Sequence, residues 1–266
     1  MLCDFHFHTE FSGDSKAPVR SHLERAITLG MKELCVTDHH DYDTRMKDNI
    51  FVLDLEHYYA AMREIQQEYA DRIRMNIGLE MGLVIRENET ISRQAGGHPY
   101  DFIIGSSHFI DGIDLYYPEF YEGRTEREAL EYYFEVTLER VRKLNYFDVL
   151  GHLDYVVRYC PNQNKNYSYE AYREHIDPIL KTLIEKGKGL ECNTGGLKYG
   201  LGHPNPTEDV LRRYRELGGE IITVGSDAHV PEHLGYDFDK MPEMLRACGF
   251  HYYTVFRERK PVFLKL

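Results

Sequence analysis

The sequence predicts an α/β fold in which seven parallel strands, alternating with helices, form a closed or nearly closed barrel of the TIM type that is one strand short. Short apolar runs recur along the chain without polar alternation, as expected of strands buried on both faces. Stretches with helical spacing of apolar residues separate these runs. No G-x-G-x-x-G follows the first run, which argues against a doubly wound open sheet.

The predicted strands are rich in Leu, Ile, Val and Phe. They are Leu2–Phe5, Glu33–Val36, Ile73–Leu79, Phe102–Gly105, Phe147–Leu150, Leu190–Cys192 and Ile221–Val224. Parallel barrel strands all end at one rim, and the catalytic groups of such barrels come from that rim. Polar residues that follow these runs are therefore expected to gather in one place.

Capping signals place the helices between the strands. Asp54 can cap a helix, Thr125 with Glu128 matches a capping box, and glycines follow several helix ends. The predicted helices are Pro18–Leu29, Asp54–Ala70, Thr125–Leu144, Ser168–Gly187, Thr207–Gly218 and Pro242–Gly249. Two further apolar runs, Tyr252–Phe256 and Val262–Leu264, close the chain as a pair.

The rest of the chain is predicted to be loops over the rim. The irregular stretches cover residues 37–51, 87–100, 109–124 and 155–167, and each follows a strand end. No repeat or linker divides the sequence, and 266 residues with 42% hydrophobic side chains suffice for one core. We therefore expect a single domain over residues 1–266.

Composition excludes several classes of protein. A net charge of −12 argues against a nucleic-acid surface, which needs clustered Lys and Arg. The sequence contains no apolar stretch of membrane-spanning length, and its start does not resemble a signal peptide. The five scattered cysteines include no C-x-x-C and indicate buried thiols in a reducing compartment. We expect a cytoplasmic protein that binds a small molecule, with no membrane or nucleic-acid partner; the oligomeric state is left open.

Histidines at the strand ends predict a metal-dependent site. The six are His6, His8, His39, His108, His152 and His229, and each has a carboxylate or another histidine nearby in sequence. Buried core histidines would show no such alignment with strand ends. Imidazoles combined with carboxylates are common ligands of Zn, Mn and Fe.

Spacing adds detail to this metal prediction. His6 and His8 are two residues apart, so on an extended strand both rings point to one side. Asp227 and His229 repeat this spacing after the last barrel strand. Glu80 follows the third strand, and its two oxygens could bridge two ions, which one imidazole cannot do.

Six motifs of the chain together resemble those of the polymerase-and-histidinol-phosphatase (PHP) superfamily. The motifs are Asp4-Phe5-His6-Phe7-His8-Thr9 with Ser12-Gly13-Asp14, Thr37-Asp38-His39, Gly78-Leu79-Glu80, Ser107-His108, Gly151-His152-Leu153-Asp154 and Gly225-Ser226-Asp227-Ala228-His229. They span almost the whole chain. The resemblance implies a distorted (β/α)7 barrel with three divalent metal ions.

The resemblance also implies which residues hold each ion. One ion would take His6, His8, Glu80 and Asp227; a second would share Glu80 and add His108 and His152; the third would be held by Asp14, His39 and His229. Many family members have a histidine at the position of Asp14, so the third site here is richer in oxygen ligands. The ions could be Zn, Mn or Fe.

Local signatures resemble the stand-alone histidinol-phosphatase branch of the superfamily. These signatures are Ser12-Gly13-Asp14-Ser15, Asp101 to Phe109, Gly151 to Asp154 followed by Arg158-Tyr159, and Glu191-Cys192-Asn193-Thr194. The branch often continues with Ser-Gly-Leu-Arg, whereas this chain has Gly195-Gly196-Leu197-Lys198. A bidentate phosphate contact would thereby become a point-charge contact.

Substrate contacts are predicted near the same rim. Arg158 is the first candidate for a phosphate clamp and Lys198 the second; the alternative for each is a solvated surface base. His40 alternates with His39 on a strand, so substrate contact or loop packing is favoured over metal binding. Tyr117 is predicted to line the pocket.

Further roles are assigned around the ions. Asp227, His229 and Arg158 are the predicted catalytic residues, and either His229 or a metal-bound water would protonate the leaving group. Asp38 and Asp154 are expected to orient imidazoles, with turn capping as the alternative for Asp154.

The expected function is hydrolysis of L-histidinol phosphate, a step of histidine biosynthesis, through attack of a metal-bridging hydroxide. The substrate rests on the resemblance, and the chemistry rests on the residues. One alternative is a broader PHP phosphoesterase acting on nucleotides or other small phosphate esters. Another is a non-catalytic metal-binding module, although competent side chains fill all the ligand positions.

Overall fold

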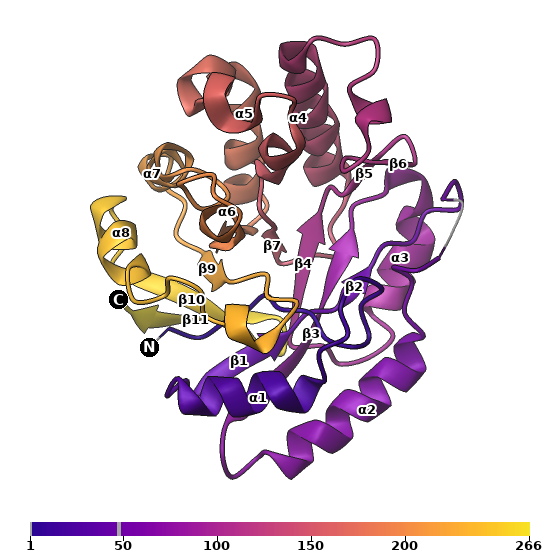
Figure 1. Ribbon diagram of the computed structural model, residues 1–266, viewed down its shortest axis with the longest axis vertical. Coiled ribbons are helices and arrows are strands. Elements are labelled where there is room, and N and C mark those ends of the chain that lie inside the picture. The colour runs from indigo at the N-terminus through magenta and orange to yellow at the C-terminus, as the bar shows by residue number, and fades with distance from the viewer. Residues whose placement is uncertain (1, 47–48) are drawn as a thin grey trace.

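The computed structural model describes residues 2–46 and 49–266 and shows a curled parallel sheet surrounded by helices (Figure 1). The sheet runs in the order β1 (Glu33–Val36), β3 (Arg74–Gly82), β4 (Phe102–Ser106), β7 (Val149–Leu150), β8 (Gly189–Asn193) and β9 (Ile222–Gly225), and β2 (His39–His40) extends the β1 edge of β3. Every strand pair in it is parallel.

The N-terminal segment, residues 4–8, joins the two edges of this sheet. The Phe5 amide donates to the Val224 carbonyl at 3.0 Å, and the Cys35 amide donates to the Asp4 carbonyl at 2.9 Å. The segment thus lies between β1 and β9 and completes a ring of seven extended segments. This arrangement confirms the TIM-like barrel that the apolar runs predict.

The first strand differs from its prediction in position and regularity. Pairing involves residues 4–8 rather than Leu2–Phe5, and within the described residues it consists of isolated bridges, Asp4 with Leu34 and Phe7 with Ala228. The side chains of His6 and His8 face the barrel interior. The backbone hydrogen bonds of this short segment are divided between β1 on one side and β9 on the other, so a regular ladder does not form on either side.

Helices cover the outside of the barrel. They are α1 (Val19–Thr28), α2 (Leu55–Glu68), α3 (Asn88–Ala95), α4 (Glu126–Lys143), α5 (Tyr169–Glu185), the four-residue α6 (Gly195–Lys198), α7 (Glu208–Glu216) and α8 (Met241–Ala247). The predicted caps are confirmed at two helices: Asp54 accepts the His57 amide, and Thr125 forms a capping box with Glu128. Among these helices none is long and apolar enough to cross a membrane.

Helix α3 lies within residues 87–100, which the sequence predicts to be a loop. Only Ile91 and Ala95 are buried on this helix, and two apolar residues are too few to reveal helical periodicity in the sequence. The stretch 109–124 likewise contains a small hairpin of β5 (Phe109–Ile110) and β6 (Ile113–Asp114). Residues 47 and 48 of the predicted loop 37–51 lie outside the described residues.

The chain ends in an antiparallel hairpin of β10 (Tyr252–Arg257) and β11 (Lys260–Lys265), which confirms the predicted closing pair. Short 3-10 turns over the rim complete the fold, at Ile85–Glu87, Pro118–Phe120, Tyr155–Tyr159, Gln163–Asn166 and Pro231–His233. At the rim, Gly225 allows a close approach, because a Cβ there would collide with His6 and with Glu191 Oε1. The fold thereby brings β9, β8 and the N-terminal segment together.

Candidate metal centre

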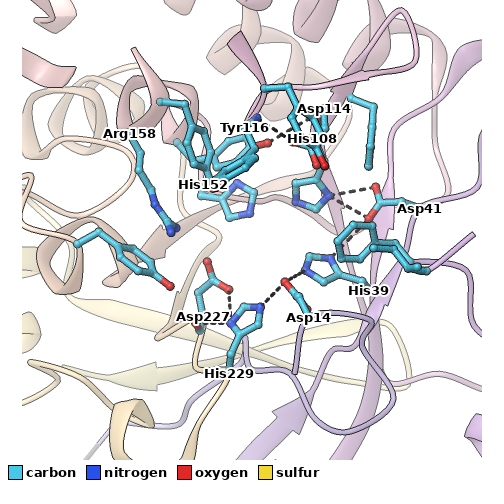
Figure 2. A pocket seen from close by; sticks show the side chains of 17 residues that line it. Asp14, His39, Asp41, His108, Asp114, Tyr116, His152, Arg158, Asp227 and His229 are labelled. Atoms are coloured by element: carbon cyan, nitrogen blue, oxygen red, sulfur yellow. Dashed lines mark hydrogen bonds and ion pairs between the residues drawn. The ribbon is translucent and has the colours of Figure 1, made fainter. Parts of the chain in front are cut away.

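A pocket of about 450 Å³ opens at the rim where the parallel strands end. Histidines and carboxylates from six different segments point into it (Figure 2). Its polar lining includes Asp14, His39, Asp41, His108, Asp114, His152, Arg158, Asp227 and His229. The structure thus brings many of the predicted site residues, from Asp14 to His229, to one cavity, while the fully buried His6, His8 and Glu80 are not part of its lining.

Glu80 occupies the centre of the cluster and is fully buried near the end of β3. Its Oε1 lies 2.9 Å from His152 Nε2 and 3.2 Å from His108 Nε2. Its Oε2 lies 3.3 Å from His6 Nε2 and 2.9 Å from His39 Nδ1. The two oxygens therefore face different sets of imidazoles, as expected of a carboxylate that bridges two ions.

His6, His8 and Asp227 form a second group next to Glu80. The Nε2 atoms of His6 and His8 are 3.1 Å apart, and His8 Nε2 is 3.2 Å from Asp227 Oδ1. Ligand atoms at about 2.0–2.2 Å from a tetrahedral zinc lie roughly 3.3–3.6 Å from one another. These donors fit around one ion.

Asp14 joins the cluster from the loop after the N-terminal segment. Its Oδ2 lies 3.0 Å from His229 Nε2 and 3.7 Å from His39 Nε2. The ring of His8 stacks against the rings of both His39 and His229, with centroid distances of 4.1 and 4.3 Å. The predicted third set of ligands is therefore assembled beside the first.

Three buried atoms of the cluster have no hydrogen bond within the described residues: His152 Nδ1, His39 Nδ1 and Glu80 Oε2. The last two lie 2.9 Å apart without hydrogen-bond geometry. An unsatisfied buried nitrogen or oxygen is costly unless a cation or water satisfies it. The donor set and these orphaned atoms both fit divalent metal ions. His39 also lies nearer to Glu80 than to Asp14, so it stands between the predicted sites.

Residues behind the imidazoles hold the rings in place. Glu191 Oε1 lies 2.6 Å from His6 Nδ1, and Asp41 Oδ1 lies 3.0 Å from His108 Nδ1. Each carboxylate can accept a hydrogen bond from Nδ1–H, which leaves Nε2 facing the cluster as the atom available to a metal ion. Neither role was predicted from the sequence, although a glutamate inside a buried strand is a signal for the role of Glu191.

The aspartates expected to orient imidazoles differ from each other. Asp38 accepts from the hydroxyl of Ser12 at 2.7 Å, and Ser12 Oγ lies 3.1 Å from His8 Nδ1, so Asp38 acts on His8 indirectly. Asp154 instead accepts from the Asn205 amide group at 2.6 Å. None of the described residues that form a hydrogen bond with Asp154 is a histidine, so its contacts hold a loop in place and do not orient an imidazole.

Charge in the cluster is strongly coupled. Burial disfavours the ionised form of Glu80, but the imidazoles of His6 and His108 outweigh it and hold the pKa of Glu80 well below its usual range. Burial also opposes the charged form of His108, yet Asp41 and Glu80 raise its pKa to about 10. The pKa of Asp227 is held well below its usual range, again against burial, chiefly by His6 and His8. In the metal-free cluster, Glu80 and Asp227 are thus ionised and His108 is protonated at neutral pH.

Arg158 and Tyr117 lie at the pocket as predicted. Arg158 enters from the side opposite to Asp41 (Figure 2), with its guanidinium carbon 3.2 Å from the centroid of the Tyr199 ring. No carboxylate among the described residues lies within 4.0 Å of that guanidinium. Tyr117 lines the mouth and is exposed. The cation of Arg158 is therefore available to an anion.

Lys198 and His40 do not line the pocket, in contrast to their predicted contact with substrate. The Lys198 ammonium donates to the Asp227 carbonyl at 2.7 Å. His40 is fully buried, and its Nδ1 accepts the Leu53 amide at 3.2 Å. Backbone groups engage the Lys198 ammonium and His40 Nδ1, whereas His40 Nε2 has no hydrogen-bond partner among the described residues. The pocket lining therefore does not support the predicted substrate contact of either residue. The expectation that His40 points away from the metal ligands is consistent with this packing.

The curled parallel barrel and the cluster at its rim define a TIM-like barrel protein with a candidate polynuclear metal centre. The chain belongs to the PHP domain family, whose model matches residues 4–195. This match agrees with the resemblance read from the motifs.

Relatives and solved structures extend the likeness over the whole chain. A histidinol-phosphatase of Lactococcus lactis subsp. lactis is 35% identical, in an alignment that covers 97% of this chain and 95% of the relative. A probable histidinol-phosphatase of Clostridium acetobutylicum is 31% identical over 100% of this chain and 97% of its own length. A crystal structure of the Lactococcus lactis histidinol phosphate phosphatase in complex with zinc, L-histidinol and phosphate superimposes with a TM-score of 0.91. Its identity is 34%, and the match covers 98% of both chains.

Proposed function

We propose that this protein is a metal-dependent phosphomonoesterase that hydrolyses L-histidinol phosphate to L-histidinol and phosphate. The observation that carries the proposal is the full-length match to the Lactococcus lactis structure, which holds zinc, L-histidinol and phosphate. The cluster around Glu80 supports it independently, since its donors fit several divalent ions.

Three sets of side chains would hold three ions, which we propose to be Zn, Mn or Fe. They are His6, His8, Glu80 and Asp227; Glu80, His108 and His152; and Asp14, His39 and His229. When bound, the ions would lower the pKa of a water for attack on phosphorus and offset charge on the phosphate oxygens. The chain's own contribution is to fix the ligands from behind, through Glu191 and Asp41.

Arg158 is the proposed phosphate clamp. Its guanidinium is held against the Tyr199 ring and has no carboxylate within 4.0 Å in the described chain. A planar guanidinium can donate two parallel hydrogen bonds to a phosphate dianion. It would stabilise charge on the phosphoryl group opposite to the metal ligands. Asp227 and His229 are the other proposed catalytic residues.

The leaving-group end of the pocket favours a cationic substrate. The Asp114 carboxylate lines the pocket beside Tyr116 and Tyr155, and burial raises its pKa. It accepts the Tyr116 amide at 2.8 Å, and no basic side chain of the described residues lies within 4.0 Å of it. The ammonium or imidazole of histidinol would complement this carboxylate, whereas an uncharged nucleoside would not. This observation favours histidinol phosphate over nucleotides.

The proposal also covers the domain organisation, the compartment and the partners of the protein. We propose a single domain over residues 1–266 that acts in the cytoplasm on a small phosphorylated substrate, without nucleic-acid or membrane partners. All five cysteines are free and buried, which fits a reducing compartment.

Steady-state kinetics would test the proposed substrate. The purified, metal-loaded protein would be assayed with L-histidinol phosphate, with a panel of nucleotides and with an aryl phosphate. We expect the highest kcat/KM for histidinol phosphate. Equal values for all substrates would indicate the broader phosphoesterase, and no turnover of any of them by the loaded protein would indicate a metal-binding module.

A further inference from the structure

The backbone of Asp227 adopts an unusual conformation at the metal centre. Its φ is +54°, in the left-handed region that residues other than glycine rarely occupy. Its amide donates to the His6 carbonyl at 2.8 Å, while its side chain faces His8. The surrounding structure must therefore hold this residue in place.

The carbonyl of Asp227 is where two side chains meet. It accepts the Lys198 ammonium at 2.7 Å and lies 3.1 Å from His229 Nδ1. A carbonyl oxygen only accepts hydrogen bonds, so His229 must present its Nδ1–H to it. In the neutral ring, Nε2 then carries the lone pair, and Nε2 is the atom 3.0 Å from Asp14.

Lys198 is placed to hold that carbonyl by the short helix α6, which it ends and which begins two residues after β8. The Gly195 amide donates to Asn193 Oδ1 at 2.8 Å, and a Cβ at Gly195 would lie 2.7 Å from this oxygen, so a larger residue would disturb the start of α6. The Lys198 ammonium also lies 3.4 Å from the Ser226 carbonyl.

The ring of Tyr199 lies close to both Lys198 and Arg158. Arg158 lies 3.2 Å and the Lys198 ammonium 4.8 Å from the centroid of this ring. Arg158 and Tyr199 line the pocket, but Lys198 does not. The two cations therefore serve different partners: the guanidinium faces the cavity and the ammonium faces backbone carbonyls.

We propose that Lys198 is a positioning residue for the Asp14–His229 side of the metal centre. Its ammonium fixes the Asp227 carbonyl, this carbonyl selects the Nδ1–H tautomer of His229, and Nε2 is thereby presented as a metal ligand beside Asp14. The inference rests on the third ion of the proposed function. It replaces the role of phosphate contact that the sequence predicts for Lys198.

Metal retention and phosphate affinity would separate the two roles. The variants are K198M, which keeps the length of the chain without the charge, K198R, which keeps a cation, and the surface control K240M, which removes an exposed ammonium paired with Asp237. Zinc affinity would be measured by chelator competition, and inorganic phosphate affinity by inhibition at saturating zinc.

For K198M we expect about 10–100-fold weaker binding of the most weakly held ion, as is typical when a residue that orients a metal ligand is lost. The other ions and the inhibition constant of phosphate should stay within about twofold of wild type, K198R should recover part of the loss, and K240M should match wild type. Unchanged zinc binding with at least tenfold weaker phosphate inhibition would overturn the proposal.

A tautomer measurement on metal-free protein, at a pH high enough for the His229 ring to be neutral, tests the inference without relying on the third ion. ¹⁵N imidazole spectra would identify the His229 signals by their absence in H229Q. Wild type should show the Nδ1–H tautomer, and K198M should show a mixture or the Nε2–H form. An unchanged tautomer in correctly folded K198M would contradict the proposal. If wild type binds fewer than three ions, the proposed number of ions fails, and the tautomer still decides the role of Lys198.

Discussion

The Nε2 atoms of His6 and His8 face each other across 3.1 Å, with both rings fully buried. Glu191 and Ser12 lie behind them, at 2.6 and 3.1 Å from the respective Nδ1 atoms. Two imidazole lone pairs cannot approach so closely in a buried site without a proton or a cation between them. The fold thus holds these buried imidazoles in a geometry that a bound metal ion would satisfy.

The first prediction concerns Glu80, whose oxygens face two sets of imidazoles. E80Q keeps the shape but removes the charge and one acceptor, so we expect loss of at least one bound ion. Activity should fall by more than the roughly 10–100-fold seen when outer partners of metal ligands are changed. Metal analysis and kcat/KM measured on the same sample check this. The control E139Q alters a surface pair with Lys143 and should retain both properties.

Glu191 gives a prediction about the support of a ligand. E191Q removes the carboxylate that lies 2.6 Å from His6 Nδ1, while its amide oxygen can still accept the His152 amide. We expect roughly 10–100-fold weaker metal binding with a folded protein. Chelator competition and circular dichroism check the two parts. Wild-type metal affinity in E191Q would show that the His6 ring is held by packing alone.

Arg158 should act on every phosphate ester in the same way. Hydrogen bonds to charged groups contribute about 1.5–3 kcal/mol, so R158M should lower kcat/KM by about 10–150-fold. The loss should be equal for histidinol phosphate and an aryl phosphate, because both present the same phosphoryl group. R158K should restore part of it as a point charge. A loss confined to one substrate would place Arg158 at the leaving group instead.

Asp114 should act on the leaving group alone. D114N keeps the size of the side chain and its hydrogen bond from the Tyr116 amide but removes the charge in the pocket. We expect kcat/KM for histidinol phosphate to fall about tenfold or more, with aryl phosphate hydrolysis within about twofold of wild type. Competitive inhibition by L-histidinol should weaken in parallel. A uniform loss for both substrates would contradict this role.

Metal binding should release protons. Burial opposes the charge of His108, but Asp41 and Glu80 raise its pKa in the metal-free protein to about 10, so His108 is protonated at neutral pH. A ligating imidazole must be neutral, hence the apparent metal affinity should fall as the pH drops below about 10, by up to tenfold per pH unit for each proton displaced. Calorimetry in two buffers with different ionisation enthalpies measures the released protons. Binding enthalpies that are independent of the buffer would contradict the charge assignment.

Much of the architecture could be predicted because parallel barrel strands bury both faces and end at one rim. The apolar runs located the strands, and the groups that follow them, such as Glu80 and His152, were found where they meet. Helix α3 escaped because only Ile91 and Ala95 carry its apolar face. Residues 4–8 pair with two neighbours at once, and periodicity within one segment cannot register that.

Side-chain partners were harder to predict than side-chain identities. Lys198 follows a strand that ends at the pocket rim, yet its long side chain places the ammonium on the Asp227 carbonyl. Glu191 reaches the imidazole of His6, which is 185 residues away in sequence. Which nitrogen of a ring faces a carboxylate depends on the assembled barrel, and no local pattern encodes it.

A zinc titration tests the central claim, a polynuclear metal centre that hydrolyses histidinol phosphate, most directly. Metal-free protein would be titrated with zinc, and bound metal and histidinol phosphate hydrolysis would be measured on the same samples. We predict no turnover without metal and a rise with bound zinc that levels off at three ions per chain. Metal-free protein that hydrolyses histidinol phosphate as fast as the loaded protein would contradict this account.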